Sequence, residues 1–387
     1  MKRLAGLALA ASVGLGVTAA QAEDLKIGMM VTLSGAPAVL GQQARDGFQL
    51  ALEHLDGQIG GMETELIVVD DELKPDVART KVEGLIERDE VDFVVGTIFS
   101  NVLQAIFKPV VESETFLISP NAGPSSFAGA ECNPYFFVTS YQNDQVHEVQ
   151  GRYAEQQGFE SVFLMAPNYQ AGRDSINGFK RHFTGEVVDE VYTQLGQLDF
   201  AAEIARIAAA QPDALFIFMP GGMGVNFVRQ FRQAGLADSI VFLSAFTVDE
   251  STLPAQKDDA VGFFGAAQWA PNLDTPENAE FVAAFEEKYD YVPGTYSFQA
   301  YDAAMLIDSA VRAVGGDLSD KDALRTALAA ADFTSLRGDF SFNNNGYPIQ
   351  DFYLLEVAKR DDGKFQTEIV EKIFDDYGDV YAENCPL

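Results

Sequence analysis

Short apolar runs alternate with amphipathic segments along nearly the whole chain after residue 24. The runs at 25–33 and 91–96 have the length and apolar character of buried strands. Between them, Ala44, Phe48 and Ala51 fall on one face of a predicted helix. Because strands that alternate with helices are typical of parallel sheets, the pattern predicts an α/β protein.

The order of elements repeats from residue 161 onward, with similar spacing but different residues. We therefore expect two lobes of like topology, each a doubly wound parallel sheet. The predicted strands lie at 25–33, 64–71, 91–96, 161–166, 186–193, 213–221 and 239–245. The predicted helices between them lie at 41–57, 74–88, 172–183, 199–210 and 225–236.

The last third of the chain begins with a proline-marked stretch and continues with helical periodicity. It predicts helices at 281–289 and 298–314, and a further helix with Ser319 as its N-cap. The segment 351–373 then reads as two strands that are joined at the turn 361–363.

The first residues have the layout of a secretory signal peptide. Lys2 and Arg3 precede an apolar run over 4–17, and small residues lead to Ala22. The run is shorter than the ~20 apolar residues of a membrane anchor. The alternative, a buried N-terminal helix, does not explain the basic start. We expect residues 1–22 to be cleaved and the mature protein to be exported.

Composition narrows the range of partners. The formal net charge of −32 repels nucleic acid and anionic membranes, so we expect neither as a partner. In an exported protein, Cys132 and Cys385 favour a disulfide, with two free buried thiols as the alternative. With three histidines in the chain, no Cys/His metal cluster is expected, and no sequence motif indicates a cofactor.

The loops after the predicted strands are rich in Gly, Pro, Ser, Thr and Asn. In open α/β sheets, ligands bind at the carboxyl ends of strands, where amides at helix starts bind anions such as carboxylates. The chain lacks a G-x-S-x-G elbow, a phosphate-binding loop and a complete G-x-G-x-x-G motif. We therefore expect a binding protein and not an enzyme, with an exported enzyme as the alternative.

Several segments resemble the periplasmic solute-binding proteins of branched-chain amino-acid-type ABC transporters. They are "IGMMVTLSG", "GQQARDGFQLALE", "VDFVVGTIFSN", "FLISPNAG", "QAGRDSINGF", "FVRQFRQAGL" and "YSFQAYDAAML". The resemblance implies a Venus-flytrap fold with three hinge crossings, a small carboxylate ligand, ABC permease subunits as partners and a monomer. It places 24–141 plus 271–349 in the N-terminal lobe, and 142–270 plus 350–387 in the C-terminal lobe.

The resemblance also implies ligand-binding positions. Ser100 matches a hydroxyl that holds the ligand carboxylate, while Leu40 and Tyr296 match residues that line the side-chain pocket. Residues 121–123 match a stretch that supplies amide and hydroxyl donors, although glycine replaces its threonine. The predicted ligand-binding residues are Leu40, Phe99, Ser100, Asn121, Ala122, Gly123, Tyr169, Ala171, Phe246 and Tyr296. Among these, Ala171 stands where the family often has tyrosine, and Tyr169 is a nearby replacement.

One position departs from the amino-acid binders. Phe246 occupies the place where they carry a carboxylate for the ligand ammonium, because a buried cation needs a counter-charge. Asp249 or Glu250 replaces that carboxylate only if the loop shifts in register. With Phe99 and other aromatic residues nearby, the sequence favours an aromatic acid of benzoate or cinnamate type. Branched-chain or other amino acids and amides are the alternative ligands, and ordinary core packing is the alternative role of Phe99 and Phe246.

Overall fold

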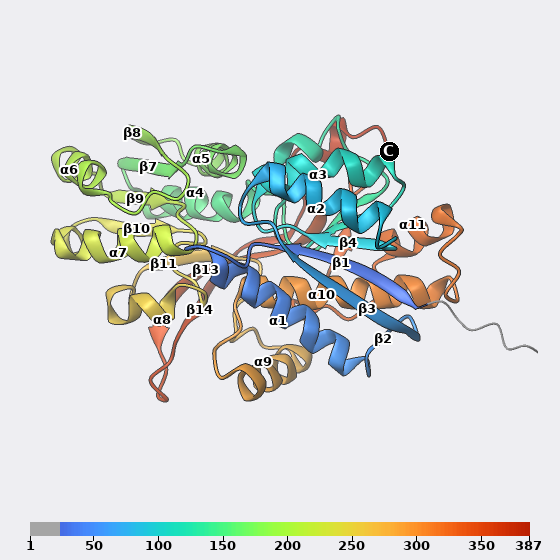
Figure 1. The fold of residues 1–387 in the computed structure, drawn as a ribbon. Coiled ribbons are helices and arrows are strands. Elements are labelled where there is room, and N and C mark those ends of the chain that lie inside the picture. Colours follow the sequence, from blue (N-terminus) through green and yellow to red (C-terminus); the bar gives the residue numbers. More distant parts are fainter. Residues whose placement is uncertain (1–23) are drawn as a thin grey trace, which may run out of the picture.

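The computed structural model describes residues 24–387, so the predicted signal peptide lies outside the described residues. Figure 1 shows two lobes, each built on a sheet that has helices on both of its faces. The first sheet has the order β2 (Gln58–Ile59), β3 (Met62–Asp70), β1 (Leu25–Val31), β4 (Phe93–Gly96), β5 (Phe116–Ser119) and β6 (Phe136–Val138). Its strand pairs are parallel except for β2 with β3.

The second sheet is parallel from β8 to β11 and ends in antiparallel strands. Its order is β12 (Ser341–Phe342), β13 (Pro348–Lys359), β11 (Phe264–Ala267), β10 (Val241–Ser244), β9 (Ala214–Ile217), β7 (Ser161–Pro167) and β8 (Glu186–Thr193), with β14 (Phe365–Tyr377) paired to β13. The predicted fold class and the predicted pair of C-terminal strands are thus confirmed. The residue limits of the lobes stay predictions.

Helices cover both sheets (Figure 1). Around the first sheet lie α1 (Ala38–His54), α2 (Pro75–Glu87), α3 (Ser100–Glu112), α9 (Pro276–Tyr289), α10 (Thr295–Ala313) and α11 (Lys321–Ala330). Around the second lie α4 (Gln145–Gln157), α5 (Gln170–His182), α6 (Ala201–Ala210), α7 (Gly222–Gln233) and α8 (Leu253–Gln256). Within residues 24–387, no helix has the length and apolar character to cross a membrane.

The start of α11 corrects one prediction. Asp320, and not Ser319, is the N-cap, because a carboxylate oxygen of Asp320 accepts a hydrogen bond from the Ala323 amide at 3.0 Å. The Ser319 hydroxyl instead donates to Asp317 at 2.6 Å, in the preceding turn. The helix therefore begins one residue later than the sequence pattern predicts.

The segments that connect the two lobes meet at one buried backbone group, the Ser140 carbonyl. It accepts hydrogen bonds from Gln350 Nε2 at 2.6 Å, from Arg337 at 3.2 Å and from Gln268 Nε2 at 3.4 Å. Ser140 follows β6, Gln268 follows β11, and Gln350 lies in β13, so three connections converge there. All four residues are buried.

A buried ion pair supports this junction. Arg337 lies 3.0 Å from Asp302 of α10, and both side chains are fully enclosed. The guanidinium group also donates to the Thr139 carbonyl, next to Ser140. An enclosed ion pair is tolerated when further hydrogen bonds satisfy its donors, as they do here. The connections between the lobes are therefore held by directional contacts as well as by chain continuity.

The C-terminal tail returns to the first lobe. Cys132 and Cys385 form a disulfide across a sequence separation of 253 residues, which confirms the favoured pairing over two free thiols. Asn345 adds polar contacts, because its side-chain amide donates to the Ala128 carbonyl at 2.7 Å and to Asp379 at 3.0 Å. The tail after β14 is thereby fixed beside the loop that follows β5.

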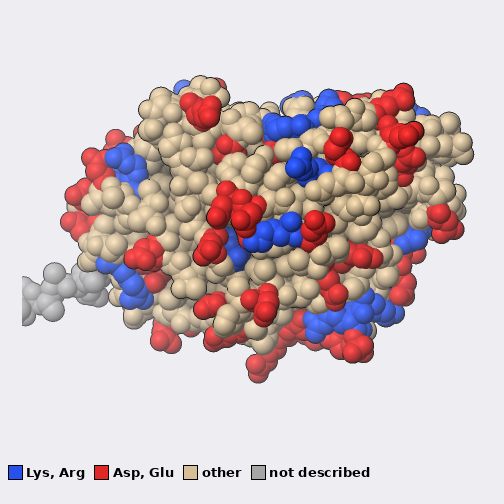
Figure 2. Space-filling view, turned by 180° about the vertical axis from the view of Figure 1, so that it is seen from behind, with Lys and Arg blue, Asp and Glu red and all other residues tan. Residues whose placement is uncertain are grey.

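The surface carries the strong negative charge of the chain. Figure 2 shows acidic side chains scattered over the face in view, with basic side chains in small groups among them. The acidity on this face is spread out and does not form a single patch. It does not extend to the pocket described below, since no Asp, Glu, Lys or Arg of residues 24–387 lines that pocket.

Candidate ligand-binding site

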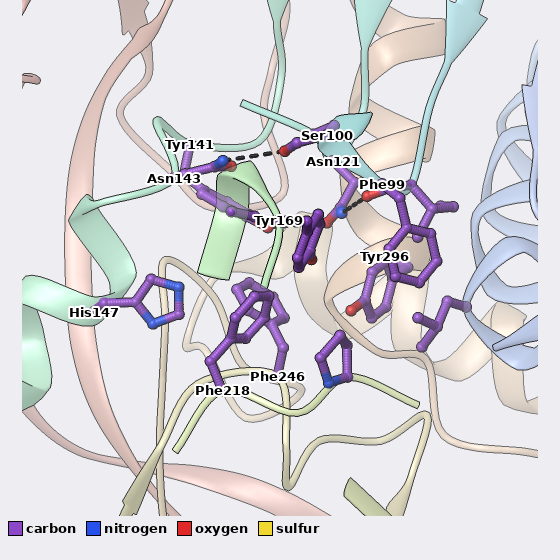
Figure 3. A pocket seen from close by; sticks show the side chains of 15 residues that line it. Phe99, Ser100, Asn121, Tyr141, Asn143, His147, Tyr169, Phe218, Phe246 and Tyr296 are labelled. Atoms are coloured by element: carbon purple, nitrogen blue, oxygen red, sulfur yellow. Dashed lines mark hydrogen bonds between the residues drawn. The ribbon is translucent and has the colours of Figure 1, made fainter. Parts of the chain in front are cut away.

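A pocket lies between the lobes, where strand ends from both sheets approach each other (Figure 3). The residues that line it are Leu40, Ile98, Phe99, Ser100, Asn121, Ala122, Tyr141, Asn143, His147, Tyr169, Ala171, Phe218, Pro220, Phe246 and Tyr296. Nine of the ten residues predicted from the sequence are among them. Gly123 is not.

Gly123 has a packing role beside the pocket. A Cβ atom at this position would lie 1.9 Å from the Tyr141 carbonyl oxygen, so a threonine would not fit. Its backbone amide donates to the side-chain oxygen of Asn143 at 3.1 Å, and its carbonyl accepts from the backbone amide of Asn143 at 2.7 Å. The glycine therefore lets the first connection between the lobes pass close to the strand-end loop of the first sheet.

The amides of this stretch are used within the protein. The Ala122 amide donates to the Thr97 carbonyl at 3.1 Å, and the Gly123 amide is bound as described. The Asn121 side chain donates to the Ile98 carbonyl at 2.7 Å and accepts from the Tyr141 hydroxyl at 3.2 Å. In this arrangement the donors that the sequence resemblance implies for Ala122 and Gly123 are not free to bind a ligand.

The polar end of the pocket is centred on Ser100, the first residue of α3. Its hydroxyl oxygen accepts a hydrogen bond from the Asn143 side chain at 3.1 Å, which leaves its own proton available to donate. The first turn of a helix also carries backbone amides without an intrahelical partner and a partial positive charge. This end can bind a carboxylate without a cationic side chain.

Aromatic side chains form the rest of the wall. Phe246 stacks on Tyr141 with a centroid distance of 5.2 Å and lies 5.9 Å from Tyr296. On the other side, Tyr169 lies 6.3 Å from both Phe99 and Phe218. These distances suit offset or edge contacts between rings. The wall can therefore enclose a flat apolar group.

Phe246 has an unusual backbone conformation. Its φ of 56° lies in the left-handed region, where a bulky residue is rare. Such strain persists when the surrounding fold enforces it, and it is often found at binding sites. Here it accompanies a ring that lines the pocket.

The pocket is narrow. The space that remains between its side chains is about 20 Å³, of the order of one water molecule. A ligand with an aromatic ring therefore requires the side chains, or the lobes that carry them, to move apart.

Polar contacts close the lobes beside Ser100. The Ser125 hydroxyl, from the loop after β5, donates to Asp174 of α5 at 2.7 Å. Asn143 donates to Asp174 at 2.9 Å as well as to Ser100. Ser100 is thus connected through the Asn143 side chain to Asp174, which forms a contact between the lobes.

Burial keeps the polar rings of the pocket neutral. It raises the pKa values of the Tyr141 and Tyr296 hydroxyls well above the usual value, and the nearby carboxylate of Asp249 adds to the shift in both. Burial lowers the pKa of His147 to about 3. The tyrosines are hydrogen-bond donors, and the imidazole is uncharged, at neutral pH.

The sequence reasoning missed six of the lining residues. Tyr141, Asn143 and His147 lie on the first connection between the lobes and the helix that follows it, away from the strand-end loops that signal a site. Phe218 and Pro220 lie near the end of the predicted strand 213–221. That position could have indicated that they line the site. Ile98, beside Phe99, completes the set.

Comparisons with known proteins agree with this architecture. Residues 24–364 match the family model described as periplasmic binding protein. Leu/Ile/Val-binding protein homolog 6 of Brucella melitensis is 28% identical over 392 residues, which cover 98% of each chain.

Two solved structures from R. palustris are similar along nearly their whole length. The solute-binding protein of an ABC transporter, in complex with benzoate, is 31% identical with a TM-score of 0.89, and the match covers 94% of this chain and 100% of that one. Another, in complex with 4-hydroxybenzoate, is 28% identical with a TM-score of 0.85, covering 92% and 98%. The resemblance seen in the sequence is thus confirmed, and the chain belongs to the family of periplasmic binding proteins.

Proposed function

We propose that this protein binds a small aromatic carboxylic acid between its lobes and delivers it, in the periplasm, to the permease subunits of an ABC transporter. The observation that carries the proposal is the composition of the pocket. A hydroxyl and a helix start form its polar end, aromatic rings form its wall, and no charged side chain from the described part of the chain lines it. We propose further that it acts as a monomer.

The absence of a charged lining residue argues against an amino acid as the ligand. An ammonium group enclosed without a counter-charge costs several kcal/mol, a large share of the ~8 kcal/mol of a micromolar complex. Glu250 does not supply the counter-charge, since its carboxylate accepts from the Thr367 amide and hydroxyl, both at 2.7 Å. An aromatic acid has no such requirement, and its ring matches the wall.

The relatives support the same ligand class. Two of the similar R. palustris structures contain benzoate and 4-hydroxybenzoate. A third solute-binding protein, from Rhodopseudomonas palustris BisB5, was solved with 3,4-dihydroxybenzoic acid and is 29% identical to this chain. The family assignment also favours binding over the alternative of an exported enzyme.

One observation favours an amino acid as the second candidate. Asp249 is buried, and its Oδ2 atom has no hydrogen-bond partner among the described residues. Its charge acts on the hydroxyls of Tyr141 and Tyr296, so it lies behind the wall of the pocket. A rearrangement that exposes Asp249 would supply the missing counter-charge. The name of the Brucella relative is consistent with such a ligand.

Calorimetry with 4-hydroxybenzoate, a cinnamate and leucine tests the proposed ligand class. We expect micromolar or tighter binding of at least one aromatic acid and at least tenfold weaker binding of leucine, because leucine carries the unpaired ammonium group. Tight leucine binding without a response to the aromatic acids would instead assign the ammonium group to Asp249.

Replacement of the proposed carboxylate-binding hydroxyl tests the polar end of the pocket. Ser100→Ala should weaken an aromatic acid by about 1.5 to 3 kcal/mol, the range for a hydrogen bond to a charged group. The matched control is Ser113→Ala, at the opposite end of α3, whose hydroxyl donates to the Val110 carbonyl. Equal affinities of the two variants in calorimetry would show that Ser100 does not contact the ligand.

The burial of Glu250 predicts a pH-dependent stability. Burial raises its pKa from 4.5 to about 7, so the folded state binds more protons than the unfolded state between these values. Its stabilising contribution is complete below about pH 4.5 and is lost as the pH rises through about 7. The glutamine of Glu250→Gln still offers an oxygen acceptor to Thr367 but does not titrate. The variant should therefore lose about 2 to 3 kcal/mol of the pH-dependent change in the free energy of unfolding.

Denaturant unfolding between pH 4.5 and 8 measures the effect. Glu368→Gln, an exposed position on β14, is the control and should follow the wild-type profile. A Glu250→Gln profile as steep as that of the wild type would show that the Glu250 carboxyl is not shifted in the folded protein.

A further inference from the structure

His147 is a buried polar side chain in the wall of the pocket without a partner at Nδ1. It is 2% exposed, and its Nδ1 atom has no hydrogen-bond partner among the described residues. Figure 3 shows its ring projecting from α4 toward the aromatic side chains of the pocket. Because native proteins rarely leave a buried nitrogen unpaired, this atom calls for an explanation.

The other two histidines of the chain are paired. His54 Nδ1 lies 2.9 Å from the Tyr301 hydroxyl, and His182 Nε2 lies 2.9 Å from the carboxylate of Glu148. Neither lines the pocket. His147, whose Nδ1 atom lacks a hydrogen-bond partner among the described residues, is thus the histidine that lines the pocket.

The surroundings of His147 are apolar. Its ring makes edge contacts with Phe216, Phe218 and Phe246, with centroid distances of 5.7, 5.0 and 6.3 Å. Burial lowers the pKa of the imidazole to about 3, so the ring is neutral at neutral pH. A neutral imidazole has one N–H donor and one acceptor nitrogen, and which nitrogen carries the proton is set by its partners. It is suited to an uncharged hydroxyl group.

The position of His147 matches the far end of a ligand that is bound through its carboxylate. Asn143, which contacts Ser100, lies in the connection just before α4, and His147 lies in the first turn of that helix. Figure 3 shows Ser100 and His147 on different sides of the pocket, with Tyr141 and Tyr169 between them. A ring held by its carboxylate at Ser100 therefore extends toward the imidazole.

We infer that His147 determines specificity for a hydroxylated aromatic acid, by a hydrogen bond to a ring hydroxyl opposite the carboxylate. This inference rests on the proposed function and narrows it from aromatic acids in general to those with a distal hydroxyl group. A ligand without the hydroxyl would leave the imidazole unpaired in an apolar environment. A site built to bind a hydroxyl discriminates against the analogue that lacks it for this reason.

The test compares benzoate with 4-hydroxybenzoate in calorimetry, in the wild type and three variants. His147→Phe keeps an aromatic ring among the three phenylalanines but has no nitrogen. His147→Asn retains a donor and an acceptor on a smaller side chain. His54→Gln is the matched histidine control, because His54 ends α1, at the opposite end of that helix from Leu40, and does not line the pocket.

We expect the wild type and His54→Gln to bind 4-hydroxybenzoate at least about tenfold more tightly than benzoate. In His147→Phe this ratio should fall to about one or reverse, and His147→Asn should restore part of it. The ratio separates recognition from a merely structural role, because a structural defect would weaken both ligands alike.

A wild-type ratio near one, or a ratio that is unchanged in His147→Phe, overturns the inference. In either case benzoate still binds and the proposed function stands. A wild type that binds the cinnamate but neither benzoate nor 4-hydroxybenzoate overturns the inference alone. A wild type that binds none of these aromatic acids contradicts the proposed function itself.

Discussion

The structure depends on how three chain connections are held together at one point. The Ser140 carbonyl receives donors from Gln268 and Gln350, which lie on the other two connections, and from Arg337. Arg337 is itself fixed by Asp302. A carbonyl enclosed in the protein must be hydrogen-bonded, so these contacts tie the connections into a common junction. Any change in the angle between the lobes has to take place around it.

The chemistry of the pocket follows from this arrangement, since one lobe supplies its polar end and the other supplies aromatic residues of its wall. The first lobe contributes the start of α3 with Ser100, and the second contributes Phe218 and Phe246. Asn143, three residues after the junction, contacts both Ser100 and Asp174. A ligand that binds the polar end therefore acts on the same side chain that helps to hold the lobes together. Closing the lobes also removes water, which strengthens the polar contacts inside.

The sequence predicted the type and order of the repeated elements because each has a clear hydrophobic period. Their ends were predicted less well, since α1 and α7 begin and end three residues earlier than the pattern indicates. Nine pocket residues were predicted mainly from the family resemblance, and the composition of the strand-end loops pointed to the same edge of each sheet. The sequence did not find Asn143 or His147, whose roles depend on how the first connection packs against the other lobe. Gly123 was predicted as a ligand contact, but it is required by a backbone approach that no local pattern reveals. Tertiary contacts between distant segments account for these differences.

The most direct test of the account is a crystal structure of the protein with 4-hydroxybenzoate. We expect the carboxylate beside Ser100 at the start of α3, the ring between Tyr169 and Phe246, and the hydroxyl within hydrogen-bond distance of His147. A ligand bound outside the space between the lobes would contradict the account, as would one whose carboxylate lies away from Ser100.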